Sequence, residues 1–249
     1  MDALAVVLTV VWALVSGWFV SLLAHQYRAD ETDSYAEPCD ALCDSCGHVM
    51  KLSDGLPLRT TCPDCGVRLP LTWAGSQLAV LTGCLLMLVV FGARIAVPFL
   101  WLIPVLVLCA TIDLRTFMIP ARIVWSGFAI GAALISVTAF AVGNTASITS
   151  AAIGAAVFFG FLYVSNWIYP AGMGFGDVRL GAVLGLYLGW VDLRLTLYGL
   201  MIGCIFGVIS GLPARLRAGH PGAAFPFGPS LALGTCCALW LYQPLVTTR

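Results

Sequence analysis

Residues 76–111 read SQLAVLTGCLLMLVVFGARIAVPFLWLIPVLVLCAT, and Arg94 is the only charged side chain among them. A helix needs roughly 20 predominantly apolar residues to cross a bilayer, with about 17 as the lower limit. The runs Ser76–Gly92 and Ile95–Thr111, on the two sides of Arg94, each reach that limit. This stretch therefore predicts two short, consecutive membrane-spanning helices.

The whole 249-residue chain has the same character, because 60% of it is hydrophobic and only 10% is charged. Soluble domains carry about 25% charged residues. The formal net charge of zero gives no electrostatic basis for binding nucleic acid. We therefore expect an all-α, polytopic membrane helix bundle in a lipid bilayer, without a nucleic-acid partner. About eight transmembrane helices are expected, near Ala3–Ala24, Ser76–Gly92, Ile95–Thr111, Ile123–Val142, Ser150–Ile168, Arg179–Trp190, Leu195–Leu212 and Pro229–Val246.

The basic residues predict how these spans are oriented. The run Ala3–Ala24 is longer than the apolar core of a signal peptide and follows Asp2, so we expect it to be a retained span. An even number of spans puts both termini on one side, and loops rich in Lys and Arg remain in the cytoplasm. One set of alternate loops holds nine basic residues and the other holds three. This count predicts that both termini lie outside and that residues 28–68 are cytoplasmic.

Four cysteines in this cytoplasmic segment form two close pairs, Cys43-x2-Cys46 and Cys62-x2-Cys65, each followed by a glycine. Two such pairs at this separation are typical of a structural zinc site. Four thiolates around one ion leave no open coordination position, so the metal would hold the loop together without catalysing a reaction. Two disulfides, a redox pair and free thiols are the alternatives, and Cys39 could replace Cys43 as a ligand.

Acidic side chains are scarce outside residues 28–68, which hold twelve of the twenty-four charged residues. The expected topology puts Asp113 and Asp177 at the same, cytoplasmic, face. In a purely structural interpretation, each aspartate is a helix-end residue paired with a nearby arginine, Arg115 for Asp113 and Arg179 for Asp177. Acids in or beside spans are rare and are functional candidates by default. The acids outside the segment are Asp2, Asp113, Asp177 and Asp192.

The segment before Asp177 favours a site, because glycines alternate at positions 172, 174 and 176. Glycine permits tight turns and close helix approach, as at an irregular helix start beside a cavity. Two carboxylates in one site cannot easily both ionise, so one can keep a proton while the other activates water. The sequence has no GxSxG elbow or HExxH helix, which argues against a serine or zinc protease. The candidate site is therefore Asp113 and Asp177, with Gly174 and Gly176 as its motif.

At these residues the chain resembles the bacterial prepilin peptidases, also called type IV leader peptidases, a family of GxGD intramembrane aspartyl proteases. The resemblance covers most of the chain. It rests on four segments, which are Asp113–Pro120, Gly172–Gly189, Pro226–Ala232 and, between the cysteine pairs, Asp54–Pro57.

The resemblance implies an endopeptidase that removes the basic leader from prepilins or pseudopilins at the cytoplasmic face of the bacterial inner membrane. Many members also methylate the new N-terminus with S-adenosylmethionine. In Gly17–Ser21 this chain has serine where the family usually has asparagine, and Gln77 and Ala79 lie where an acid is common. The loop between Cys46 and Cys62 is also shorter than usual. Proteolysis is therefore better supported than methylation.

The sequence also predicts a division into three parts. Residues 1–27 form the first transmembrane helix, residues 28–70 a small zinc-ribbon-like domain with four cysteines, and residues 71–249 the transmembrane peptidase domain. The alternative function is a proton- or cation-coupled transporter that uses the same two aspartates. Against it, the two halves of the chain show no apparent repeat.

Overall fold

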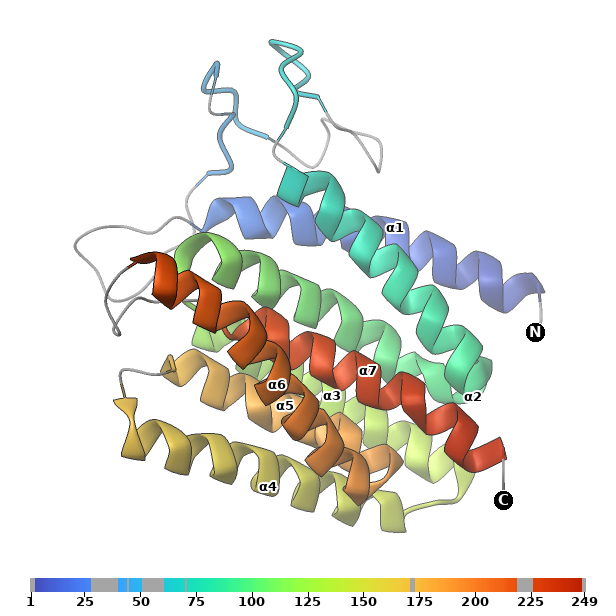
Figure 1. The fold of residues 1–249 in the computed structure, drawn as a ribbon. Coiled ribbons are helices and arrows are strands. Elements are labelled where there is room, and N and C mark those ends of the chain that lie inside the picture. Colours follow the sequence, from blue (N-terminus) through green and yellow to red (C-terminus); the bar gives the residue numbers. More distant parts are fainter. Residues whose placement is uncertain are drawn as a thin grey trace. The chain divides into compact units, whose positions relative to one another are not determined.

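The structure, a computed structural model, describes residues 3–27, 40–43, 45–50, 61–69, 71–170, 173–218 and 226–247, with backbone alone for 212–218 and 243–247. Within these ranges the chain is helical, apart from short connections and two turns that carry the cysteine pairs (Figure 1). The expected all-α class is confirmed. The helices are α1 (Ala3–Gln26), α2 (Leu71–Thr116), α3 (Ala121–Val142), α4 (Ala146–Ile168), α5 (Phe175–Val191), α6 (Leu193–Ala218) and α7 (Gly228–Thr247).

The described ranges contain seven helices where eight were expected, because the second and third expected spans are both part of α2. This helix has 46 residues, which at about 1.5 Å per residue is more than twice the thickness of a bilayer core. Gly92 interrupts it with φ 70° and ψ 165°, and the chain doubles back there (Figure 1). A Cβ atom on Gly83, in the first arm, would lie 2.7 Å from Cγ2 of Ile103 in the second. The two expected spans are thus the two packed arms of α2.

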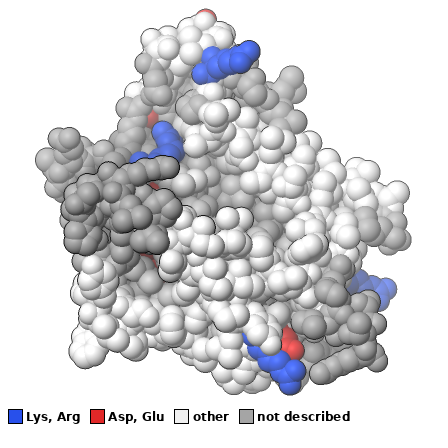
Figure 2. Space-filling view, in the orientation of Figure 1, with Lys and Arg blue, Asp and Glu red and all other residues white. Residues whose placement is uncertain are grey.

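The helices are long and apolar enough to make this a multi-pass membrane protein. Five of them meet the length and hydropathy requirements for a span, namely α1 to α4 and residues Leu193–Gly211 of α6. Their outer faces carry exposed leucine, valine, phenylalanine and tryptophan side chains, as expected for contact with lipid. In the view of Figure 2 most of the described surface carries no charge.

The chain divides into two compact units, Met1–Thr116 and Phe117–Arg249. In the first unit α1 packs along α2, and Nε1 of Trp12 donates a hydrogen bond to the carbonyl of Leu100. The hydroxyl of Ser21 lies 2.9 Å from that of Ser76 and bonds to the carbonyl of Trp73. The three-part division based on the sequence stays a prediction.

In the second unit α5 is the central helix, in contact with α3, α4, α6 and α7. Its residues from Asp177 to Trp190 are buried, apart from the half-buried Arg179. A helix that is apolar on all sides is expected in such a position. Because α5 is enclosed, the residues at its start are held by neighbours on several sides.

Helices α4 and α5 run antiparallel and approach closely at three glycines of α5 that are four residues apart. A Cβ atom on Gly181 would lie 2.7 Å from Cδ1 of Leu162, and one on Gly185 would lie 2.7 Å from Cβ of Phe158. Gly189 meets Gly154 in the same way, at 2.9 Å from its Cα. Each step of four residues along α5 matches a step of four back along α4. We call this contact the glycine ladder.

Candidate catalytic aspartates and metal centre

Asp113 lies in the last turn of α2, within the first unit, and its side chain is only 4% exposed. Two residues further on, Nη1 of Arg115 donates a hydrogen bond of 2.9 Å to the carbonyl of Ala24 on α1. Asp113 is thus a buried acid at a helix end.

Asp177 lies in the first turn of α5, within the second unit, and is 5% exposed. Its backbone N–H donates to the carbonyl of Gly174, the N-cap residue, at 3.1 Å. The unpaired N–H groups at a helix start favour a negative charge there. The guanidinium of Arg179 lies over the ring of Phe175, with Cζ 4.7 Å from the ring centroid.

Of the two motif glycines, Gly176 is tightly packed and Gly174 has open space beside it. A Cβ atom on Gly176 would lie 2.9 Å from Cβ of Ile119 and 3.3 Å from its backbone N and O. A Cβ atom on Gly174 would lie 3.6 Å from Oδ2 of Asp177. The missing side chain at Gly176 therefore permits close packing against Ile119, and the missing side chain at Gly174 leaves the space next to the carboxylate open. Gly172 lies outside the described residues.

Asp113 and Asp177 belong to different units, so their union in one site stays a prediction. The sequence did not single out Ile119 as a neighbour of the motif, nor Asn166, whose Nδ2 donates to the carbonyl of Met173 at 2.8 Å. Asn166 is a polar residue near the end of the apolar run Ser150–Ile168. A polar residue at that position could have been recognised from the sequence as a candidate.

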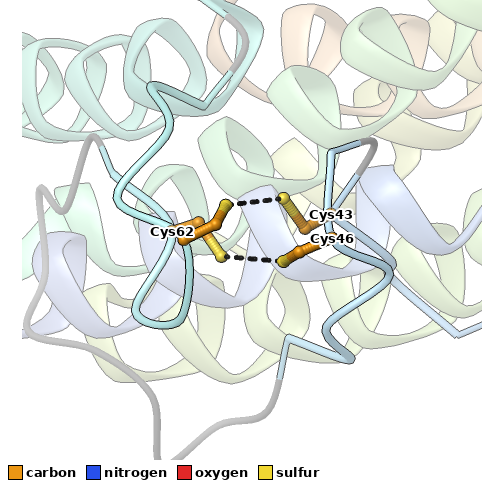
Figure 3. Close-up of side chains that lie close together, drawn as sticks. Cys43, Cys46 and Cys62 are labelled. Carbon is orange, nitrogen blue, oxygen red and sulfur yellow. Dashed lines mark hydrogen bonds between the residues drawn. The ribbon is translucent and has the colours of Figure 1, made fainter.

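The four cysteines of the two CxxC pairs come together as the sequence predicts. Their sulfur atoms all lie within 4.8 Å of one another, and Cys43 to Cys65 and Cys46 to Cys62 are each 3.8 Å apart. Figure 3 shows the side chains of Cys43 and Cys46 on one turn directed towards Cys62 on the other. Four sulfurs at about 2.3 Å from one tetrahedral ion would be separated by about 3.8 Å. The thiols are free, so the disulfide alternative is not observed.

The two cysteine turns have the same backbone structure, which explains the glycine after each pair. Gly47 and Gly66 adopt positive φ angles of 71° and 68°, and each donates its N–H to the carbonyl of the first cysteine of its pair. Such angles are readily adopted only by glycine. Both turns therefore present two sulfurs on one side. Cys39 and the segment Asp54–Pro57 lie outside the described residues.

The backbone around the cysteines stabilises thiolates, which are the form that binds metal. Hydrogen bonds from the backbone of Ser45 and Cys46 lower the pKa of Cys43 to about 7. The backbone of Cys65 and Asp64 lowers the pKa of Cys62 in the same way. At Cys46 the backbone of His48 acts in the same direction, but desolvation and the neighbouring thiols outweigh it and raise the pKa to about 12. The donor set and its spacing thus fit a closed four-thiolate metal site.

Comparison with known proteins places this chain among peptidases. The sequence model of the type IV leader peptidase family matches residues 100–212, a range that includes both aspartates. Three relatives are each named prepilin leader peptidase/N-methyltransferase. That of Pseudomonas putida is 32% identical over 80% of this chain and 71% of its own length. That of Burkholderia pseudomallei (strain K96243) is 27% identical over 94% and 85%. That of Bacillus subtilis (strain 168) is 29% identical over 80% and 80%.

No solved structure matches the chain significantly. The relatives nevertheless align over most of both sequences, and the family match spans the end of α2, the linker to α3 and all of α5. These are the elements that carry Asp113, Ile119, Gly174, Gly176 and Asp177. On this evidence the chain belongs to the type IV leader peptidase family.

Proposed function

We propose that Asp113 and Asp177 are the catalytic pair of this membrane-embedded peptidase. The observation that carries the proposal is that both carboxylates are at least 95% buried at helix ends, in a chain with very few acids outside residues 28–68. A buried ionisable group is costly unless a function or a partner requires it. The transporter alternative receives no support from the comparisons, because the relatives described above are named as peptidases.

Chain connectivity supports a shared site. Ile119, which contacts Gly176, follows Asp113 by six residues. The last turn of α2 advances about 1.5 Å per residue and an extended chain about 3.5 Å, so Cα of Asp113 lies within roughly 15 Å of Cα of Ile119. A carboxylate at the end of α2 is thus tethered to the segment that packs beside Asp177.

In this proposal the two carboxylates share one proton, because two negative charges at close range disfavour each other. The ionised carboxylate takes a proton from water as the water attacks the scissile carbonyl. The protonated carboxylic acid first stabilises the developing oxyanion, and the amine then leaves as it gains a proton. The apparent pKa values of such a pair belong to the pair and not to either residue.

The proposed substrates are prepilins, which the relatives' names specify, or the related pseudopilins. A protease binds its substrate as an extended backbone, and the open side of Gly174 next to Asp177 offers such room. The scissile bond should therefore lie in the leader, just before the hydrophobic helix of the substrate. We place this reaction at the cytoplasmic face of the bacterial inner membrane.

Cleavage of a tagged prepilin by membranes that contain single variants tests the catalytic pair. We expect Asp113→Asn and Asp177→Asn each to abolish the shift to the mature size, because a neutral amide can neither accept the proton from water nor return it. Asp192→Asn is the matched control, since this acid accepts a backbone hydrogen bond from Arg194 at the start of α6. Clear residual turnover in either of the first two variants would contradict the proposal.

We also propose that Cys43, Cys46, Cys62 and Cys65 bind one structural zinc ion. When bound, zinc would cross-link the two cysteine turns, and it would take no part in hydrolysis because all four positions are filled by sulfur. The lowered pKa values of Cys43 and Cys62 favour zinc binding near neutral pH.

N-methylation of the new N-terminus is a second proposed activity, supported by the relatives' names. The cavity between the cysteine turns and the ends of α1 and α2 has about 160 Å³. Pockets for ligands the size of S-adenosylmethionine hold roughly 300 Å³ or more, so the described cavity does not fit this cofactor. Transfer of a labelled methyl group in the cleavage assay tests the activity.

A further inference from the structure

The start of α5 is fastened to the end of α4 by two side chains. Nδ2 of Asn166 donates a hydrogen bond of 2.8 Å to the carbonyl of Met173. The ring of Tyr163, one turn earlier on α4, meets the ring of Phe175 edge-on, with centroids 6.4 Å apart. Met173 and Phe175 are the two neighbours of Gly174, the N-cap of α5. The backbone is therefore attached to α4 on both sides of this cap.

This attachment matters because the N-cap of α5 has no side chain of its own. Most helix starts are held by a serine, threonine, aspartate or asparagine that bonds to the exposed N–H groups. Gly174 cannot do this, and in the turn its carbonyl accepts the N–H of Asp177. The bond from Asn166 fixes the peptide between Met173 and Gly174, and so it fixes the direction in which the turn begins.

The glycine ladder places Asn166 level with Met173. Gly189, Gly185 and Gly181 of α5 meet residues at successive turns of α4, and the pairing of Asn166 with Met173 continues the same antiparallel register. Contacts as close as these leave little freedom to slide, because interiors are close-packed. The packing of α4 against α5 therefore fixes the position of the Asn166 amide along the axis of α5.

We infer that Asn166 is a positioning residue for Asp177, through the carbonyl of Met173 and the first turn of α5. The inference rests on the proposed catalytic role of Asp177. Without the amide, Gly174 loses its link to α4 and the first turn of α5 frays. The carboxylate of Asp177 then leaves its productive position, and a misplacement of about 1 Å can cost roughly 100-fold in rate.

The test compares the purified full-length enzyme with its Asn166→Ala, Asn166→Gln and Ser165→Ala variants on a tagged prepilin. Ser165 is the matched control, because its hydroxyl bonds only within α4, to the carbonyl of Phe161. We expect Asn166→Ala to lower kcat roughly 10- to 100-fold while KM stays within about twofold. Asn166→Gln retains an amide donor. Its log kcat should therefore regain at least about a third of the decrease seen in Asn166→Ala.

Hydrogen exchange gives a readout that does not depend on activity. The backbone N–H groups of residues 173–177 should exchange faster in Asn166→Ala than in Ser165→Ala, whereas the middle of α5 should be unchanged. The inference is overturned if Asn166→Ala keeps kcat within about twofold of the control. It is also overturned if the loss of kcat tracks a loss of thermal stability, with no rescue by glutamine and no local change in exchange.

Asp177→Asn in the same assay distinguishes the positioning role of Asn166 from the catalytic role of Asp177. If this variant is inactive and Asn166→Ala is fully active, only the positioning role fails. If Asp177→Asn itself cleaves the substrate, the catalytic assignment fails and the positioning role fails with it.

Discussion

At the residue scale, Gly176 shows most directly why the motif before Asp177 contains glycine. Its neighbour is Ile119, a residue of the linker between α2 and α3, and the approach involves the backbone of Ile119 as well as its side chain. A backbone cannot rotate out of the way as a flexible side chain can. The glycine therefore determines how closely this linker approaches the aspartate.

We expect Gly176→Ala to lower cleavage at least about tenfold and to destabilise the fold by about 1–3 kcal/mol, the usual range for overpacking. The cause is the Cβ atom, which would lie 2.9 Å from Cβ of Ile119. Cleavage assays and thermal denaturation in detergent measure the two effects. Gly160→Ala is the control, because a Cβ atom there has nothing within 4 Å. Equal behaviour of the two variants would show that Ile119 yields easily.

At the element scale, the contact between α4 and α5 decides the position of the whole candidate site in the second unit. Neither helix has a strong apolar face of its own, since both are apolar almost all round. Their register is instead set by small residues that let the backbones touch, which is a common way for membrane helices to associate. A larger side chain at the contact between α4 and α5 should therefore push the two helices apart.

Gly185→Ala tests this, because a Cβ atom there would lie 2.7 Å from Cβ of Phe158 and would also meet the backbone of Gly154. We expect a lower melting temperature and reduced cleavage, although position 185 is two turns away from Asp177. Gly160→Ala, on the opposing helix but in open space, should melt no lower than the unmodified protein. A melting temperature for Gly185→Ala that equals the control's would show that the helices can adjust.

At the scale of the whole molecule, the protein combines apolar helices with a polar segment that carries half of the charged residues. The described part of this segment is held by two cysteine turns and by a small cluster of Trp18, Leu22, Ala41, Met50 and Trp73. That cluster links the turns to α1 and α2. Loss of metal should therefore loosen the segment without changing the aspartates directly.

We expect the purified, reduced protein to contain about one equivalent of zinc by elemental analysis. Cys46→Ala should lose it, and Cys204→Ala, a change in α6 outside the cluster, should keep it. Acidification should weaken zinc binding and finally release the metal, because protons compete with zinc for the thiolates. Less than about half an equivalent at neutral pH would contradict the site.

The orientation predicted by the basic residues is testable on intact cells and on inverted membrane vesicles. A protease added outside should spare residues 28–68 in cells and cut them in inverted vesicles, because that segment is predicted to be cytoplasmic. A tag at the C-terminus should be accessible from the outside of cells. Cleavage within residues 28–68 in intact cells would reverse the proposed topology.

Much of the fold follows from local sequence. The apolar runs predict helices long enough to cross a bilayer, and the spacing of Cys43, Cys46, Cys62 and Cys65 predicts their convergence, because both depend on residues close together in the chain. The eighth separate helix is the exception. Gly92 reverses the chain within one residue, so the two expected spans are the two arms of α2, and Arg94 is the one charged residue at their boundary.

The sequence by itself determined which residues are candidates, because charge is so scarce in the membrane part that Asp113 and Asp177 stand out without a structure. Only the tertiary structure decided what surrounds them: the burial of both acids, the contact of Gly176 with Ile119 and the bond from Asn166 to Met173. The physical reason is that the sequence of an apolar membrane helix does not indicate which other helix it packs against. Its register is set by the fit of two backbones, and that fit depends on residues far apart in the chain.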